Sequence, residues 1–282
     1  MVAGHVGDQG RTRCPTAAPG LRPAHRASGP VCTLCVVLLD QETENEVVHE
    51  LCQLLGRAIL PVSRFDKPGA AADGYGTAFF YTELVGSTND GDVVHEWLLT
   101  ADACAGAPYG EIGLRPSVTE PAGVASDAIL LPDFAGQWLH LPEVGLAAMP
   151  TGGLHGHAED RGWHWRTQQV TEAVAAGADA VAWVGAEAGS AFVLALGVAE
   201  DGSRPLEAVV ERVARVGDDV CVTTELPTGY VGAPVFAVEA APGGELALRC
   251  LGLVLPGADG GHPVATFDRI RSALAAATAG YR

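Results

Sequence analysis

Positive charge is scarce in this chain of 282 residues, where 17 Lys and Arg stand against 34 Asp and Glu and the formal net charge is −17. A surface this acidic repels a phosphate backbone or an anionic membrane at long range. A long apolar run is also lacking, since the one near residues 36–39 falls far short of the roughly 18 residues that a membrane-spanning helix needs. We therefore expect neither nucleic acid nor a membrane as a partner.

The sequence also lacks the cysteine pattern of a disulfide framework. The seven cysteines are odd in number and widely spaced, at positions 14, 32, 35, 52, 104, 221 and 250. This usage favours a reducing compartment. Cys32 and Cys35 form a C-x-x-C, but a zinc site needs further ligands and only His25 and His49 lie nearby. We expect no metal and no cofactor.

The first 42 residues lack a secretion signal. Four arginines followed by a short apolar stretch at 31–39 are similar to the first two parts of such a signal. No small-residue cleavage pattern follows, however, and the next residues are Asp40, Gln41 and Glu42. We interpret residues 1–42 as a disordered, Pro- and Gly-rich leader, and expect a cytoplasmic protein.

Apolar periodicity predicts a helix followed mainly by strands. Thr43 is a suitable N-cap for a helix over 43–57, and Thr266 opens an amphipathic helix over 267–277. Residues 206–216 fit either a strand or a helix. The other expected strands are 59–64, 77–84, 93–100, 144–149, 181–184, 191–199, 220–224, 235–239 and 246–255. With 48% hydrophobic residues, the chain is long enough for two cores.

Three segments carry the functional signal. Residues 97–104 read WLLTADAC, residues 143–150 read EVGLAAMP, and residues 229–236 read GYVGAPVF. In this order they resemble the His, Asp and Ser motifs of trypsin-like (chymotrypsin-fold) serine proteases, in the bacterial branch of that family. In each segment the catalytic position holds another residue: Ala103 for the general base, Gly145 for the orienting Asp, and Val231 for the nucleophile.

Two further segments extend the resemblance to about residues 58–275. Residues 74–81, GYGTAFFY, resemble the strand before the His motif, and residues 178–185, ADAVAWVG, resemble the strand that opens the second barrel. The resemblance implies a mainly β fold of two six-stranded antiparallel barrels, over 58–165 and 166–282, with an N-terminal helix before them and a C-terminal helix at the end.

The missing side chains bear directly on chemistry. A serine hydroxyl becomes a nucleophile only when a base takes its proton, and that base is oriented by a carboxylate. No serine lies between Ser203 and Ser272. Asp102 is adjacent to Ala103, and neighbouring residues on a strand face opposite ways. His95, Thr228 and Cys221 are too far from the motif positions along the chain, so we expect no stand-in.

We expect the chain to retain the ability to bind a ligand although it has lost catalysis. The resemblance implies an oxyanion hole made by the backbone N–H groups of Gly229 and Val231, which needs no catalytic side chain, and Tyr230 lies between them. The resulting hypothesis is a catalytically inactive homologue that binds a protein or peptide, or regulates one. One alternative is an active hydrolase with a rearranged catalytic set. Another is a structural module of a larger signalling or defence assembly.

Two simpler interpretations stay open. In an unrelated β protein, Gly229 and Gly232 would be turn glycines, Val231 a core residue and Pro234 the mark of an edge strand. The histidine-rich stretch 152–165 contains the possible metal ligands His155, His157, Asp160 and His164. We interpret it as a flexible loop between the barrels, because His-x-His still lacks a third ligand.

Overall fold

A computed structural model describes residues 36–89, 91–123, 128–196, 205–240, 246–257 and 260–279. Cys14, Cys32, Cys35 and most of the predicted leader lie outside this part of the chain. Residues 36–40, which the prediction assigned to the leader, lie within it. Val37 donates to the carbonyl of Val238 and accepts from the amide of Ser190, so this segment is attached to the second half of the molecule.

The predicted N-terminal helix is confirmed as α1 (Gln41–Leu55), which continues into the short η1 (Gly56–Ala58). It begins earlier than expected, because the carboxylate of Asp40, rather than Thr43, caps it by accepting the amide of Thr43 at 3.0 Å. Glu44 is almost fully buried and accepts hydrogen bonds from Ser190 and Arg212 of the second half. The helix is thereby fixed to the barrel of the second half, although in sequence it leads directly into the first half.

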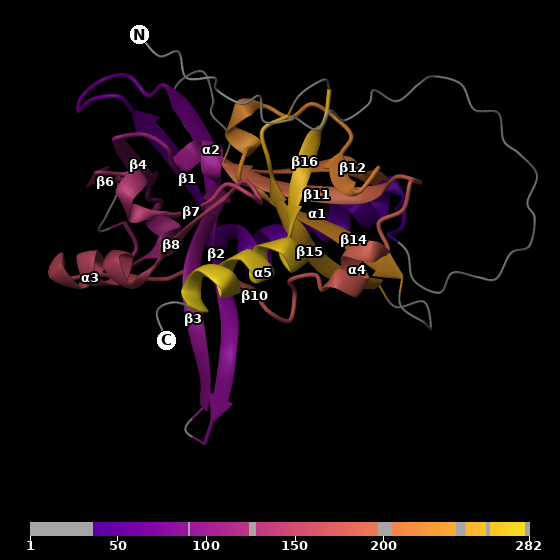
Figure 1. The fold of residues 1–282 in the computed structure, drawn as a ribbon, viewed down its shortest axis with the longest axis horizontal. Coiled ribbons are helices and arrows are strands. Elements are labelled where there is room, and N and C mark those ends of the chain that lie inside the picture. The colour runs from indigo at the N-terminus through magenta and orange to yellow at the C-terminus, as the bar shows by residue number, and fades with distance from the viewer. Residues whose placement is uncertain are drawn as a thin grey trace, which may run out of the picture.

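The first half, predicted as a six-stranded antiparallel barrel, is a curled half-barrel (Figure 1). Its order is β6-β4-β1-β2-β3-β8-β7, with β10 pairing in parallel to β2. In the described residues the sheet ends at β6 on one side and at β7 on the other, so it forms a half-barrel. Its strands are β1 (Ile59–Phe65), β2 (Gly74–Thr88), β3 (Gly91–Ala101), β4 (Tyr109–Gly113), β6 (Ala128–Pro132), β7 (Leu139–Leu141), β8 (Leu146–Pro150) and β10 (Val170–Thr171).

The second half confirms the predicted closed barrel, in the order β11-β12-β13-β16-β15-β14. Residues 206–216, which fitted two periods, form a strand because they pair on both sides, with β11 and with β13. The strand β16 was not expected from its Gly-rich surroundings. The strands are β11 (Gly189–Leu196), β12 (Leu206–Val216), β13 (Asp219–Val222), β14 (Pro234–Ala240), β15 (Leu246–Val254) and β16 (His262–Thr266).

Two segments differ from their predictions. Residues 178–185, expected to open the second barrel as a strand, instead contain the helix α4 (Ala178–Ala182). Its Ala-rich sequence favours the helix, and β11 opens the barrel. The predicted flexible loop at 152–165 contains the helix α3 (Gly152–Asp160) and the strand β9 (His164–Trp165), which pairs with β5 (Thr119–Glu120). Leu154 and Ala158 are buried and fix α3 to the core of the first half.

The remaining elements are short, apart from the C-terminal helix. Helix α5 (Phe267–Thr278) confirms the prediction, with Thr266 at its N-cap. The others are α2 (Asp102–Ala105), η2 (Pro116–Val118), η3 (Ala135–Gln137) and η4 (Thr228–Tyr230). No helix within the described ranges is long and apolar enough to cross a membrane.

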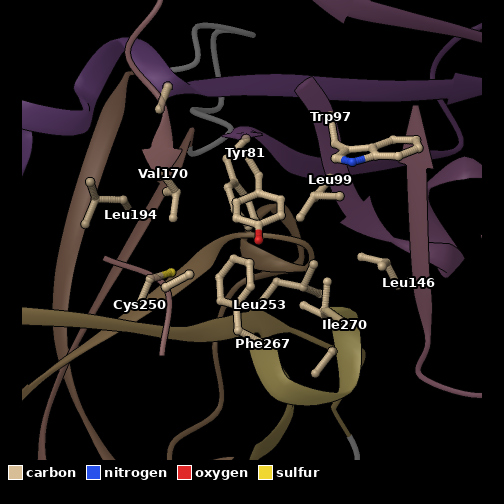
Figure 2. Packing of buried hydrophobic residues seen from close by; sticks show 14 of the residues in the cluster. Tyr81, Trp97, Leu99, Leu146, Val170, Leu194, Cys250, Leu253, Phe267 and Ile270 are labelled. Carbon is tan, nitrogen blue, oxygen red and sulfur yellow. The ribbon is translucent and has the colours of Figure 1, made fainter. Parts of the chain in front are cut away.

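A core between the two halves holds them together. Figure 2 shows Tyr81 of β2 above Phe267 of α5, with Leu194, Cys250 and Leu253 of the barrel beside them. The rings of Tyr81 and Phe267 are 4.9 Å apart between centroids. The hydroxyl of Tyr81 donates to Glu172 at 2.6 Å, and Glu172 in turn pairs with Arg271 of α5 at 2.7 Å.

Candidate functional site

The structure brings the three degenerate motifs to the junction of the two halves. Helix α2 carries Ala103, and the amide of Asp102 at its start donates to the carbonyl of Gly145 at 2.8 Å. This bond places the first two motif positions next to each other. Gly145 lies in the turn between β7 and β8, so strand pairing fixes its position relative to β3.

The third position joins them from the second half. The carbonyl of Val231 accepts the amide of Thr77 in β2 at 2.9 Å, and the thiol of Cys104 lies 3.7 Å from the same oxygen. Val231 therefore contacts both the strand before the first motif and the helix that carries Ala103. The side chains at these three positions are a methyl group, a hydrogen and an isopropyl group, none of which can transfer a proton.

Two glycines explain how closely the segments approach. Gly232 has φ +89°, and a Cβ at this position would lie 2.2 Å from the carbonyl oxygen of Thr77 and 2.4 Å from the hydroxyl of Thr100. Only glycine fits there without moving one half from the other. Gly145 has φ +70°, and a Cβ would lie 2.9 Å from a methyl group of Leu255. A carboxylate side chain at position 145 would therefore be strained in this backbone conformation.

A cleft of two adjoining cavities runs along this junction. The larger, about 650 Å³, is lined by Asp102, Ala103 and the 142–145 turn on one side and by Leu255 to Gly257 and Val264 on the other. The smaller, about 270 Å³, is lined by Val231, Glu225, Thr228 and His262. Pro256 and Gly257 line both cavities. Each half of the molecule supplies one wall of the larger cavity, whereas the second half alone lines the smaller one. The larger cavity therefore depends on the central core that joins the halves.

The walls of the larger cavity are mainly apolar with an acidic bias. The acidic side chains are Asp102, Glu143 and Asp219, and the basic one is Arg269, which pairs with Asp219 at 3.1 Å. A neutral or cationic chain segment fits this lining better than an anion does.

The expected oxyanion-hole residues are already engaged in part. The amide of Val231 donates to the carbonyl of Thr228 at 3.2 Å, within the turn of η4. The carbonyl of Gly229 accepts the hydroxyl of Thr77 at 2.7 Å. Val231 would have to give up its bond to hold an anion, so the residual oxyanion hole stays a prediction.

Tyr230 belongs to the core of the barrel. Its side chain is 2% exposed, and its hydroxyl donates to Glu207 at 2.6 Å. Burial, with the carboxylate of Glu207 beside it, raises the pKa of the phenol. It lines neither cavity of the cleft, so the ring is not placed to contact a ligand there.

Sequence reasoning missed His140, which lies beside the cleft. Its Nδ1 is 2.5 Å from Oδ1 of Asp102, and its Nε2 is 2.9 Å from the carbonyl of Ala135. His140 lies outside the three motif segments, 37 residues after Ala103. The pairing of β7 with β8 brings His140 close to Asp102, and this pairing is the feature that could have identified it.

The histidines of the 152–165 stretch do not gather around a metal site. His155 binds Glu96 at 2.9 Å, and Glu96 also accepts from Gln169 and Thr151. Although partial burial opposes the shift, these hydrogen bonds lower the pKa of Glu96. Within the ranges that the structure describes, no three His, Cys, Asp or Glu side chains are grouped to hold a metal ion.

Cys104 is a free, buried thiol, as the sequence predicted. Burial raises its pKa to about 11. A thiol with so high a pKa is mostly protonated, and therefore a poor nucleophile, at neutral pH.

No family model matches the chain, and no curated protein matches it. Among solved structures, the serine protease of human pathogenic astrovirus superposes with a TM-score of 0.41 and 15% identity, over 76% of this chain and 91% of that one. The serine endoprotease of Yersinia pestis has a TM-score of 0.41 and 11% identity, over 83% of this chain and 65% of that one. With both TM-scores below 0.5, these likenesses assign neither an activity nor site residues to this chain.

Proposed function

We propose that this protein is a catalytically inactive homologue of trypsin-like serine proteases, and that its cleft binds an extended segment of a protein or peptide. The observation that carries the proposal is the meeting of Ala103, Gly145 and Val231 at the junction of the two halves, through the bonds of Asp102 and Cys104. Residues without acid, base or nucleophile therefore stand at the place where the motifs predict a triad.

The size and lining of the cleft support a peptide ligand. Its two cavities, about 650 and 270 Å³, share Pro256 and Gly257, so one extended chain can occupy both. Apolar walls with a few polar groups are typical of sites that bind by burial and are oriented by hydrogen bonds. Nothing in this mode of binding needs the lost catalytic side chains.

Selection from a random peptide display library, with the immobilised full chain as bait, tests the proposal. Ala103 is exposed and lines the larger cavity, so Ala103→Trp fills the cleft without entering the core. Ala276→Trp, at an exposed position of α5, is the matched control. We expect enriched peptides whose affinity falls more than about tenfold with Ala103→Trp and stays unchanged with Ala276→Trp. No enrichment, or equal affinity for both variants, would reject the proposed cleft.

One observation favours the alternative of a hydrolase with a rearranged catalytic set. The contact of His140 with Asp102 is the arrangement by which a carboxylate orients a general base. Against this role, the other ring nitrogen of His140 contacts the carbonyl of Ala135, so neither nitrogen is left to accept a proton from a nucleophile. Turnover of a broad peptide substrate mixture by the native chain, lost in His140→Gln, would favour this alternative.

A further inference from the structure

His140 lies between two groups that can only accept hydrogen bonds. On one side is a carboxylate oxygen of Asp102 in α2, and on the other is the carbonyl oxygen of Ala135 in η3. A neutral imidazole carries one N–H and one bare nitrogen, so it can satisfy one of the two. Both contacts are short, at 2.5 and 2.9 Å, and each therefore needs a proton on its ring nitrogen.

We propose that His140 is a positioning residue that acts as an imidazolium and holds one wall of the cleft by bridging α2 to η3. Loss of one ring proton breaks one of the two contacts. Asp102 and Ala103 line the larger cavity, so loss of the bridge between α2 and η3, by either contact, loosens that wall. The cleft is then formed at low and neutral pH and loses this support as the pH rises.

The other charges around His140 are few. Asp133 lies beside Gly136 at the η3 turn, Arg64 binds the carbonyl of Ala103 on α2, and Glu143 follows β7. Strand β8, which pairs with His140 through Ala147, is apolar over Leu146–Pro150. Asp102 is therefore the carboxylate that sets the charge state of the ring.

The expected titration agrees with this geometry. Partial burial opposes the charged form, but the hydrogen bonds to Asp102 and Ala135 together raise the pKa of His140 above its ordinary 6.5. A group whose pKa is higher in the folded than in the unfolded state stabilises the fold fully below the unfolded value. That contribution is lost as the pH rises through the folded value. The side chain of His140 is 34% exposed, so solvent weakens the effect without changing its direction.

Nitrogen-detected NMR of the ring, recorded on the full chain from about pH 5 to about pH 9, tests the proposal. We expect both ring nitrogens of His140 to be protonated at neutral pH, and Asp102→Asn to remove the elevation of its pKa. Glu96→Gln is the matched control, because it removes the carboxylate partner of His155 and leaves His140 unchanged. A neutral tautomer at pH 7, or an unaltered pKa in Asp102→Asn, would overturn the proposal.

Hydrogen exchange of the Asp102 amide, which donates to Gly145, reports on the wall itself. After correction for the intrinsic rate, we expect its protection to fall as His140 loses its proton, and to be low at every pH in His140→Gln. Protection that does not follow the titration would overturn the role in the cleft wall. This role matters for binding only if the proposed function holds, but neither measurement uses a ligand. A failed peptide selection with a protonated His140 would therefore reject the function and leave this inference standing.

Discussion

The two halves of the molecule fill their hydrophobic cores with different kinds of residue. The barrel interior receives side chains from all six strands, and these are almost entirely valine, alanine and leucine, with Tyr230 as the one fully buried aromatic of this cluster. Phe192 and Phe236, on β11 and β14, belong instead to the core between the halves. The half-barrel instead packs large rings, among them Phe80, Phe134, Trp138 and Trp163. Small side chains fill a narrow closed barrel, whereas an open sheet encloses a wider space. In the first half, aromatic side chains and helix α3 thus fill the wider interior. In the second half, closure of the barrel keeps the interior narrow.

The larger cavity of the cleft depends on both halves. Each half buries its own core, and the rings of Phe79, Tyr81 and Phe267 join them in a third. Val231, which lines the smaller cavity, is followed by Gly232, where the two halves approach closely. Perturbing one half, the other, or the contact between them should therefore have separable effects.

Phe134→Ala should have the largest effect. Phe134 is fully buried, packs on Trp138 at 5.6 Å between centroids and lies against Gly110. We expect a loss of about 3–5 kcal/mol of unfolding free energy. Val193→Ala, inside the barrel, should cost less, about 1.5–3 kcal/mol. Urea denaturation followed by tryptophan fluorescence measures both. Equal losses would remove the contrast between the two cores.

Gly232→Ala tests the contact between the halves. The new methyl group would meet the backbone of Thr77 and would also be strained by the positive φ, so we expect a loss of about 2–5 kcal/mol. Gly217→Ala is the control, since φ is +63° there and nothing lies within 4 Å of the position that its methyl group would take. It should cost only the backbone strain of about 1–2 kcal/mol. Thermal unfolding compares the two, and a larger loss for Gly217→Ala would contradict the account.

Arg271→Met tests the link between α5 and the segment that joins the halves. Arg271 pairs with Glu172 and donates to the carbonyls of Ala175 and Ala176. Because charged donors are lost at partly buried acceptors, we expect a cost of about 1.5–3 kcal/mol. Arg269→Met breaks a more exposed pair on the same helix and should cost below about 1 kcal/mol. Chemical denaturation of the two variants under the same conditions measures the difference.

Cys104 gives a measurement without a substitution. With its pKa raised to about 11 by burial, about one thiol in a thousand is ionised at pH 8. Alkylation followed by peptide mapping should therefore find Cys104 unmodified in the native chain and modified in urea. The half-buried Cys52 should react sooner. Rapid native modification of Cys104 would mean that the junction opens readily.

The sequence predicted most strands because their alternation is local. Residues 59–64, 77–84 and 93–100 all lie within strands, and α1 and α5 were found from their periodic apolar faces. What it could not predict depends on distant pairing. Whether a sheet closes depends on which strand edges meet in space, so the closure of one sheet but not the other was not predicted. Helix α4 was not predicted either, because the resemblance implied a strand there.

The candidate site was likewise predictable only in part from the sequence. Ala103, Gly145 and Val231 were identified from motif order alone, and hydrogen bonds bring their segments together. The burial of Tyr230 and the bond of Val231 to Thr228 follow from the η4 turn, which no motif encodes. His140 reaches Asp102 only through the register of β7 on β8, so a search limited to neighbouring residues could not find it.

The most direct test of the proposed loss of catalysis is covalent labelling of the native full chain by a broad serine-reactive phosphonate, read by intact mass, with an active trypsin-like protease as the positive control. Because Val231 carries no hydroxyl and Ala103 carries no base, we predict no added mass. A stoichiometric adduct on the native chain would contradict the proposal that the triad is lost.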